Sequence, residues 1–331
     1  MQAAVLDGPN LPPVVRNVVE PKLVPGEVLV HLRAAALNHR DVWIQQGKYA
    51  GLKYPIIPGS DGAGLVSAVG GGVDSAWVGR EVIINPGSDW GDDPRAQSAN
   101  FTILGLPRDG TFAEYVAVPA AQLQPKPEHL DWPAAAALPL AGLTAYRAVF
   151  SRGGLAEGEN VLITGIGAGT ALFALQFAVA AGARVFVTSS SEEKIARARE
   201  LGALGGVNYR TEGWSDELVK HAGKFDLIID SAVGPGFNGL VDVAKPGARI
   251  VFFGGTAGAV PELNPRPIFW KQLSILGSTM GTPEDFAAMI QFVLIRELRP
   301  IVSQSFPLSS APEAFDLMAR GGQFGKIVLT V

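Results

Sequence analysis

In the second half of the chain, apolar positions gather in short continuous runs separated by helical patterns. Apolar runs bounded by turn residues are typical of strands buried on both faces of a parallel sheet. We expect such strands at 161–164, 184–188, 205–208, 225–230, 248–253 and 273–277. Because helices alternate with these strands, the sequence predicts a doubly wound α/β domain.

The N-terminal third has a different pattern, in which apolar and polar positions alternate. Alternation with a period of two is typical of strands with one buried face, and it predicts strands at 28–34, 64–70 and 81–84. Residues 85–110 are rich in Gly, Pro and Asp and predict a long loop, before a further strand at 112–118. This part of the chain is therefore expected to be a β-rich domain.

Prolines mark the junction between the two patterns, at Pro125 and Pro127. The last 30 or so residues return to short strands around a helix at 312–320, and we expect them to rejoin the β-rich domain. The predicted domains are a β-rich domain of residues 1–124 and 300–331 and a Rossmann-type nucleotide-binding domain of residues 125–299.

A glycine-rich turn follows the first strand of the second domain. Its residues, just before an apolar helix, are Gly165, Gly167, Ala168, Gly169 and Thr170. Glycines let the backbone turn tightly and approach a pyrophosphate, which rests on the positive N-terminus of the following helix. The spacing departs from GxGxxG, but the order of strand, turn, helix and strand favours a dinucleotide site over a turn without a ligand.

Hydroxyl side chains at the end of the second strand favour NADP over NAD. An NAD site places Asp or Glu about 20 residues beyond the glycines, whereas this chain has Ser189 and Ser190 there, followed by Lys194 and, after the third strand, Tyr209. Hydroxyls and a cation suit a 2′-phosphate, which a carboxylate would repel. The spacing of Ser190 and Glu193 also predicts a capping box at the start of the next helix. The alternative to a phosphate site is that the serines only cap this helix and that Lys194 is a solvated surface residue.

Composition narrows the possible partners. With 47% hydrophobic and 18% charged residues, the chain fits a compact enzyme, and its net charge of −4 argues against nucleic acid as a partner. No apolar stretch reaches about 18 residues, so we expect no membrane partner and a cytoplasmic location. The absence of cysteine removes thiol nucleophiles, disulfides and cysteine-ligated zinc.

The order of the two patterns resembles the medium-chain dehydrogenase/reductase superfamily, in which a GroES-like domain precedes a Rossmann domain. The stretches that carry the resemblance are 38–41, 58–64, 110–116, 141–146 and 325–329. Within the superfamily the chain looks most like the zinc-independent quinone oxidoreductases. That resemblance implies NADP(H) as the cofactor and quinones or activated carbon–carbon double bonds as substrates.

Three positions separate the chain from the zinc-dependent alcohol dehydrogenases. Where those enzymes carry zinc ligands, this sequence has Asn38, Ser60 and, near the third position, Leu140. Catalytic zinc needs donors such as Cys and His, so these three residues cannot build the site. His39 stands beside the first position, but a single histidine is more often a polar surface group than a ligand. We predict no metal.

The resemblance also implies which residues face the nicotinamide. Asn38, Asp41, Trp43 and Tyr49 are implied to line the catalytic cleft, where Tyr49 would hydrogen-bond a substrate oxygen or relay a proton. Alternatively, Asn38 and Asp41 satisfy buried backbone groups, and the two aromatic residues form only pocket wall. The resemblance also implies that the nicotinamide is contacted by Thr144, Phe253, Gly254, Ser278 and Thr279. Family positions that match Ser190, Lys194 and Tyr209 contact the 2′-phosphate.

The predicted function is NADPH-dependent reduction of a small electrophile, a quinone, enal or enone, by hydride transfer. With neither metal nor nucleophile, the nicotinamide carries the chemistry and the protein orients the substrate. Two alternatives remain open: an NADPH-binding structural or regulatory protein with incidental reductase activity, and an alcohol dehydrogenase-like enzyme. Family members commonly pair through the last strand of the nucleotide domain, so we expect a homodimer through 273–277.

Overall fold

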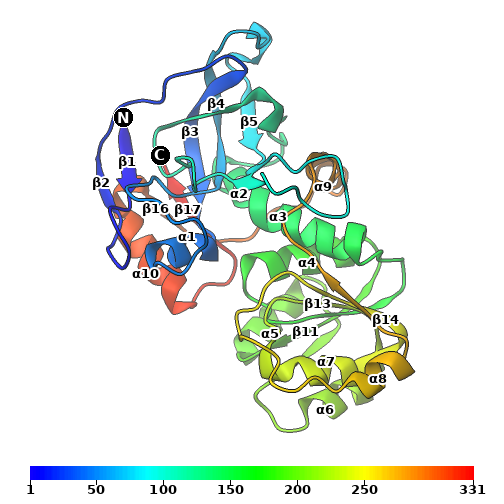
Figure 1. The fold of residues 1–331 in the computed structure, drawn as a ribbon. Helices are drawn as coiled ribbons and strands as arrows, with labels where there is room; N and C mark the ends of the chain where they lie inside the picture. The colour runs from blue at the N-terminus through cyan, green and yellow to red at the C-terminus, as the bar shows by residue number, and fades with distance from the viewer. The chain divides into compact units, whose positions relative to one another are not determined.

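The computed structural model describes residues 1–331 and forms two compact units, each described by itself below (Figure 1). Unit 1 consists of Met1–Ala141 and Gly281–Val331, and unit 2 consists of Gly142–Met280. None of the helices combines the length and apolar character that crossing a bilayer requires. The mixed α/β architecture, with one β-rich unit and one parallel-sheet unit, is the predicted fold class.

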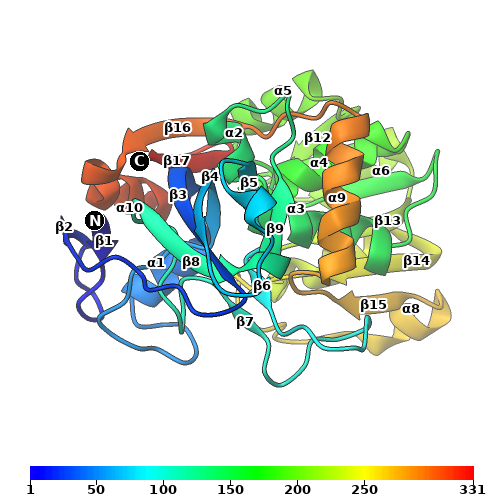
Figure 2. The ribbon, with the colours of Figure 1, turned by 90° about the horizontal axis from the view of Figure 1, so that it is seen from above.

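Unit 1 is built on a seven-stranded sheet in the order β16-β17-β3-β4-β5-β9, with β8 paired to β3 beside this path (Figure 2). Its strands are β3 (Glu27–Ala36), β4 (Asp61–Val69), β5 (Glu81–Ile84), β8 (Tyr115–Pro119), β9 (Leu123–Pro125), β16 (Val302–Pro307) and β17 (Lys326–Thr330). Two short pairs join β1 (Gln2–Val5) to β2 (Val14–Asn17) and β6 (Gly87–Ser88) to β7 (Thr102–Ile103). The unit's helices are α1 (His39–Gln45), α2 (Trp132–Ala137), α9 (Pro283–Ile295) and α10 (Ala311–Arg320).

The alternating pattern of β3 places every second side chain in the core. Val28, Val30 and Leu32 are fully buried, whereas the intervening residues are partly exposed. The C-terminal strand β17 pairs antiparallel with β3, and Phe315 of α10 packs edge-on against Phe112 with ring centroids 5.9 Å apart. The C-terminal end of the chain therefore lies in the β-rich unit.

The compact units divide the chain elsewhere than the sequence suggested. Their limits lie at 141/142 and 280/281, not at 124/125 and 299/300. Past the prolines the chain stays in unit 1, because β9 pairs with β5 and the N–H of Lys126 donates to Glu81 O. The prolines bend the chain at a strand end but do not mark the end of the unit.

Unit 2 is a six-stranded parallel sheet in the order β12-β11-β10-β13-β14-β15. Its strands are β10 (Asn160–Ile163), β11 (Arg184–Ser189), β12 (Gly205–Asn208), β13 (Phe225–Asp230), β14 (Ala244–Phe252) and β15 (Ser274–Gly277). The helices are α4 (Gly169–Ala180), α5 (Glu192–Glu200), α6 (Trp214–Ala222), α7 (Phe237–Val243) and α8 (Pro265–Trp270), preceded by α3 (Pro139–Tyr146) and a π-helical turn at Arg147–Arg152. All six predicted strands are present, and their order is that of a dinucleotide-binding Rossmann sheet.

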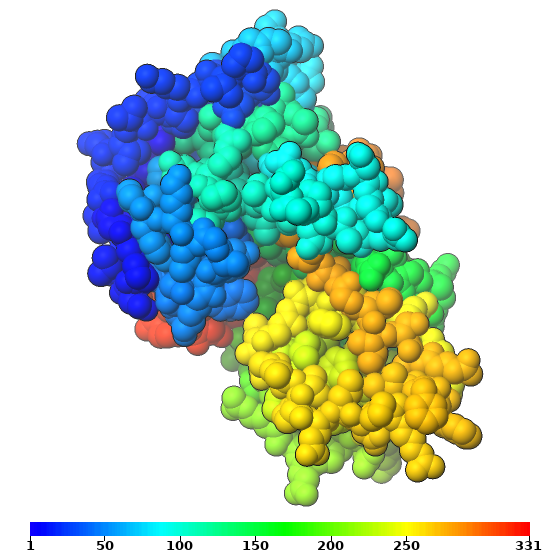
Figure 3. All heavy atoms as spheres, in the orientation of Figure 1, coloured from blue at the N-terminus to red at the C-terminus, as the bar shows by residue number.

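The edge of this sheet at β15 carries an exposed aromatic surface. The side chains of Phe269 and Trp270, at the end of α8, are 66% and 80% exposed. The yellow-to-orange part of the chain, which contains α8, lies at the surface of unit 2 in Figure 3. Large exposed aromatic side chains beside a free strand edge are typical of an interaction surface.

Candidate functional site

The three positions that correspond to zinc ligands in the related enzymes meet around one buried carboxylate in unit 1. Asp61, which is fully buried, accepts hydrogen bonds from Asn38 Nδ2 at 2.9 Å and from the backbone N–H of Leu140 at 2.8 Å. Ser60 precedes Asp61 directly. The sequence assigned these positions to one site, and the fold gathers them there.

A lysine from the far end of the chain supplies the positive charge of this cluster. Lys326 Nζ donates to Asp61 Oδ2 at 3.0 Å, to Asn38 Oδ1 at 2.7 Å and to Leu37 O at 2.7 Å. The side chains of the ion pair are 4% and 0% exposed. All three ammonium donors are used, and the amide oxygen of Asn38 already has a cation as its partner.

A second cation stands at the histidine-ligand position. Arg40 of α1 is 5% exposed, and its Nη1 donates to Ser60 Oγ at 2.5 Å and to Leu104 O at 2.7 Å. Ser60 Oγ in turn donates to Leu104 O at 2.8 Å. The groups around these positions are thus an amide, a hydroxyl, two cationic side chains and the carboxylate of Asp61, whose oxygens already accept hydrogen bonds from Asn38, Leu140 and Lys326. Without Cys or His donors this set does not fit a zinc ion.

Asp41, a predicted catalytic residue, lies completely inside the protein. Its carboxylate accepts the N–H of Asn38 at 2.8 Å and the N–H of Gly59 at 3.3 Å. Burial raises the pKa of Asp41 to about 6, against the smaller opposing effects of Arg40, the Asn38 hydrogen bond and Lys326. These bonds join the start of α1 to the turn before β4, which is the structural role that the sequence left open for this residue.

Two predicted aromatic residues flank α1. Trp43 is half-buried, with its ring tilted towards His39 at a centroid distance of 6.3 Å. Tyr49 is half-buried against a small apolar cluster, and its ring lies 5.0 Å from Arg40 Cζ. The imidazole of His39 reaches solvent, but its pKa is still lowered. The larger cause is desolvation by the surrounding protein, and the smaller one is the positive charge of Lys326. The ring is therefore neutral near pH 7.

In unit 2 the glycine-rich turn has the geometry that the sequence predicts. Gly165 and Gly167 have φ of +64° and +118°, which L side chains rarely adopt. Helix α4 begins at Gly169 after Ala168, and no side chain caps its first N–H groups. Open N–H groups at the start of a twelve-residue helix suit a pyrophosphate.

The side chain of Lys194 lies against this turn. A Cβ added to Gly167 would come within 2.6 Å of Lys194 Cδ and 3.3 Å of its Nζ. A larger residue at 167 would therefore displace the lysine. This proximity could not be derived from the sequence, and it brings a cation to the turn where the cofactor phosphates are expected.

The predicted capping box is wrong. The N-cap of α5 is Ser191, whose hydroxyl accepts the N–H of Lys194 at 3.3 Å, so Ser190 and Glu193 do not cap the helix. The helix starts one residue later than the spacing suggested because β11 continues to Ser189. Ser190 is thereby left beside Tyr209, whose N–H donates to Ser189 O at 3.1 Å. The fold brings together the serines, Lys194 and Tyr209 that were predicted to hold a 2′-phosphate.

The other predicted cofactor residues lie at the ends of unit 2 elements. Thr144 is 7% exposed, and its hydroxyl lies 3.9 Å from Met280 Sδ. Ser278 Oγ is buried without a partner, whereas Thr279 is exposed. Gly254 follows Phe253, and a Cβ added to this glycine would come within 2.8 Å of Ser231 O. An orphaned hydroxyl and a close backbone approach fit a site that a cofactor completes.

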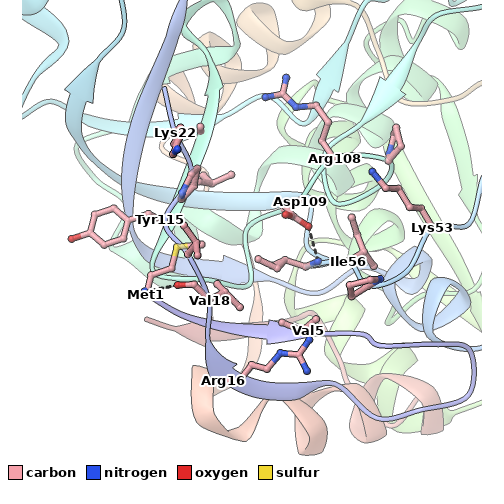
Figure 4. Close-up of a pocket in the computed structure, with 18 of the residues that line it drawn as sticks. Met1, Val5, Arg16, Val18, Lys22, Lys53, Ile56, Arg108, Asp109 and Tyr115 are labelled. Atoms are coloured by element: carbon pink, nitrogen blue, oxygen red, sulfur yellow. Dashed lines mark hydrogen bonds between the residues drawn. The ribbon is translucent and has the colours of Figure 1, made fainter. Parts of the chain in front are cut away.

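A separate hollow of about 510 Å³ lies in unit 1 (Figure 4). Its walls include Lys22, Lys53, Arg108 and Asp109, and it shares no residue with the cluster around Asp61. Asp109 accepts the N–H of Ile57, and Arg108 pairs with Glu27. None of the residues predicted from the sequence lines it, so the hollow is not the predicted site.

Two family patterns match the chain. The Zinc-binding dehydrogenase family matches residues 169–294, and the Alcohol dehydrogenase GroES-like domain matches residues 24–128. The first match covers most of unit 2 and extends into α9 of unit 1, and the second lies within unit 1.

Relatives match over almost the whole chain. A "Zinc-type alcohol dehydrogenase-like protein YogA" from Leptosphaeria maculans is 37% identical over 96% of this chain and 95% of its own. A "Crotonyl-CoA carboxylase/reductase" from Cereibacter sphaeroides is 32% identical over 92% of this chain and 80% of its own. A "Quinone oxidoreductase" from Pongo abelii is 29% identical over 97% and 94%.

A solved structure of an NAD-dependent alcohol dehydrogenase covers 100% of both chains with a TM-score of 0.94 and 38% identity. The chain therefore belongs to the medium-chain dehydrogenase/reductase superfamily of oxidoreductases. Members with this pair of domains bind a nicotinamide cofactor, and the turn at Gly165–Gly169 fits that group.

Three residues of the site were missed by the sequence analysis: Arg40, Asp61 and Lys326. Each stood within a stretch that carried the family resemblance. Only the fold shows that residues 265 positions apart form an ion pair. The available signal was that Lys326 directly precedes an apolar run, 327–329, in the predicted C-terminal strands.

Proposed function

We propose that this protein is a zinc-independent, NADPH-dependent reductase of quinones or activated carbon–carbon double bonds. The observation that carries the proposal is the state of the zinc-ligand positions, where Asn38 and Ser60 bind Lys326 and Arg40. The two cations already occupy the side-chain oxygens of Asn38 and Ser60, and the charge of Arg40 repels a divalent metal.

The substrate class follows from what the site lacks. Oxidation of an alcohol requires its hydroxyl proton to leave, which a bound metal assists by lowering the alcohol's pKa. A quinone or an enone is already electrophilic, so orientation next to a bound nicotinamide, which supplies the hydride, is sufficient help. The relative named crotonyl-CoA carboxylase/reductase makes an activated double bond the favoured substrate feature.

The cofactor proposal rests on the residues around the glycine turn. Ser190, Lys194 and Tyr209 present hydroxyl groups and a cation, and no carboxylate occupies the end of β11. An NADP 2′-phosphate would find charge-assisted hydrogen bonds there. The solved relative described as NAD-dependent makes the other cofactor the alternative to be tested.

The decisive assay is a substrate panel with both cofactors. NADPH oxidation is expected with small quinones, enals or enones, and little NADP⁺ reduction is expected with primary alcohols. Fast alcohol oxidation together with inactivity towards every quinone and enone would instead support an alcohol dehydrogenase, as the names of several relatives suggest. Inactivity towards both groups, with NADPH bound, would favour the structural or regulatory role.

We also propose a homodimer formed through β15. This strand is at the edge of the parallel sheet, and Phe269 and Trp270 are exposed beside it. Large aromatic residues often dominate the binding energy of interfaces, at about 2 kcal/mol or more each. Light scattering is expected to show a dimer at micromolar concentration, and Trp270→Glu is expected to shift it towards monomer. A monomeric wild-type protein would contradict this assembly.

A further inference from the structure

Arg40 is a buried guanidinium without a carboxylate partner. Its Nη1 is bound by Ser60 Oγ and Leu104 O, and its Nε lies 3.4 Å from Tyr49 Oη. The neighbouring Asp41 is turned to the backbone N–H groups of Asn38 and Gly59. Thus Arg40 is held in place by neutral groups, and its positive charge is not cancelled by an ion pair.

The remaining nitrogen of Arg40 is open to solvent. Nη2 makes no hydrogen bond to the protein. It is also not one of the fully buried side-chain atoms that lack a partner, which are Arg249 Nε, Ser278 Oγ and Gln323 Oε1. Nη2 therefore reaches solvent although the residue as a whole is 5% exposed. A fixed cation with one accessible pair of N–H groups is a preorganised donor for an oxygen that gains negative charge.

The neighbouring cation cannot serve the same purpose. Lys326 directs all three of its N–H groups to Leu37, Asn38 and Asp61, and the carboxylate of Asp61 balances its charge. Of the two cations at the former zinc-ligand positions, only Arg40 has an unused donor and no ion-pair partner.

We propose that Arg40 Nη2 binds the carbonyl oxygen of the substrate and stabilises the negative charge that forms on it. The inference rests on the reductase activity proposed above. The hydride of the reduced cofactor adds to the electrophilic carbon, the π electrons move to the carbonyl oxygen, and the cofactor is oxidised. Water then supplies a proton to the α-carbon of the enolate and is left as hydroxide. With a quinone, water protonates the oxygen of the anionic adduct, and a proton shift from the ring carbon to the second oxygen gives the quinol. Arginine keeps its protons throughout.

This assignment gives Arg40 the electrostatic part of the role that a metal has in the zinc enzymes. Removal of one such donor commonly lowers kcat by about 10²- to 10³-fold, because the interaction is strongest in the transition state. The KM should change much less. A substrate whose double bond is not conjugated to a carbonyl oxygen should gain nothing from Arg40.

The test compares Arg40→Met, Arg40→Lys and Arg40→Ala with the wild type on one enone and one quinone. The Ser60–Leu104 hydrogen bond does not involve Arg40, so part of the local structure should persist in the variants. We expect kcat to fall by about 10²- to 10³-fold in Arg40→Met and less in Arg40→Lys, which keeps the charge. Millimolar guanidinium should restore part of the activity of Arg40→Ala.

The matched control is Arg80→Met. Arg80 is also an arginine of unit 1 that lies over an aromatic ring, that of Trp77, but it is exposed. The kcat of Arg80→Met should equal that of the wild type. Folding is followed by the melting temperature of each variant.

Wild-type kcat in folded Arg40→Met or Arg40→Lys overturns the inference and leaves Arg40 as a link between α1 and Leu104. A loss of kcat in folded Arg40→Lys with rescue of Arg40→Ala supports it, even where Arg40→Met does not fold. Absence of turnover in the wild-type protein itself contradicts the proposed function instead, so the two failures are distinguishable.

Discussion

The charged groups of the Asp61 cluster in unit 1 and those beside the glycine turn in unit 2 are arranged in opposite ways. Asp61 and Lys326 are buried, and the hydrogen bonds of the fold use their polar atoms. At the turn, the first N–H groups of α4 have no side-chain cap, and Lys194 and Tyr209 lie at least partly exposed. The first arrangement serves the structure, whereas in the second the uncapped N–H groups of α4 leave capacity for an anionic ligand.

Because of this difference, substitutions at the two places should affect different measured quantities. Changes in the buried cluster should appear mainly in the free energy of unfolding, because its charges have no access to water. Changes at the turn should appear mainly in cofactor affinity. Arg40 is the exception within unit 1, since it is buried among neutral partners but keeps one donor open.

The largest expected effect is the loss of stability in Lys326→Met. The substitution leaves the carboxylate of Asp61 buried without its cation, which should lower the free energy of unfolding by about 3–5 kcal/mol. Urea unfolding of the wild type and of Lys326→Met measures this loss of stability. The double variant Lys326→Met/Asp61→Asn removes both charges and should recover much of the loss; equal stability of the wild type and Lys326→Met would show that the pair is not buried in solution.

The pH dependence of stability should reveal Asp41. Its folded-state pKa is about 6, above the ordinary value of 3.8, so the folded protein binds a proton more tightly than the unfolded chain. Stability relative to Asp41→Asn should therefore rise as pH falls through 6, by about 2.5 kcal/mol at pH 4 and about 3 kcal/mol in total at pH values below 3.8. Chemical unfolding of both proteins from pH 7 to pH 4 measures this difference. A constant difference across that range would mean that Asp41 titrates at its ordinary value.

Lys194→Ala should weaken NADPH binding while hardly changing NADH binding. Loss of one charge-assisted hydrogen bond to a phosphate costs about 1.5–3 kcal/mol, or roughly ten- to hundredfold in Kd. Cofactor titration by fluorescence measures both constants, and Lys220→Ala on the exposed side of α6 is the control. Equal affinity of the wild type for the two cofactors would overturn the NADP assignment.

The same contrast explains what could be predicted from the sequence. The turn at 165–169 is a local feature, because its glycines, strand and helix are contiguous. The strands Phe225–Asp230 and Ala244–Phe252 likewise follow from continuous apolar runs. The cap of α5 was misplaced by one residue, since three consecutive serines allow several caps with nearly equal local geometry. The compact units have other limits than the predicted domains, and near Pro125 the reason is the long-range pairing of β9 with β5.

The unit 1 site depends on contacts that no local pattern encodes. Asn38 and Ser60 were recognised as substituted positions, but the cations that bind them come from Lys326 and from the buried face of α1. Whether a serine, lysine or arginine in a family motif is buried depends on elements folded from distant segments. The chemistry of the site therefore emerged only from the structure.

Elemental analysis combined with turnover tests the central claim most directly. The purified protein should contain no stoichiometric zinc, and its NADPH-dependent reduction of a quinone or enone should be unchanged after treatment with a chelator, because Asn38, Ser60 and Leu140 cannot build the metal site. About one zinc per chain, lost together with activity on chelation, would contradict the account.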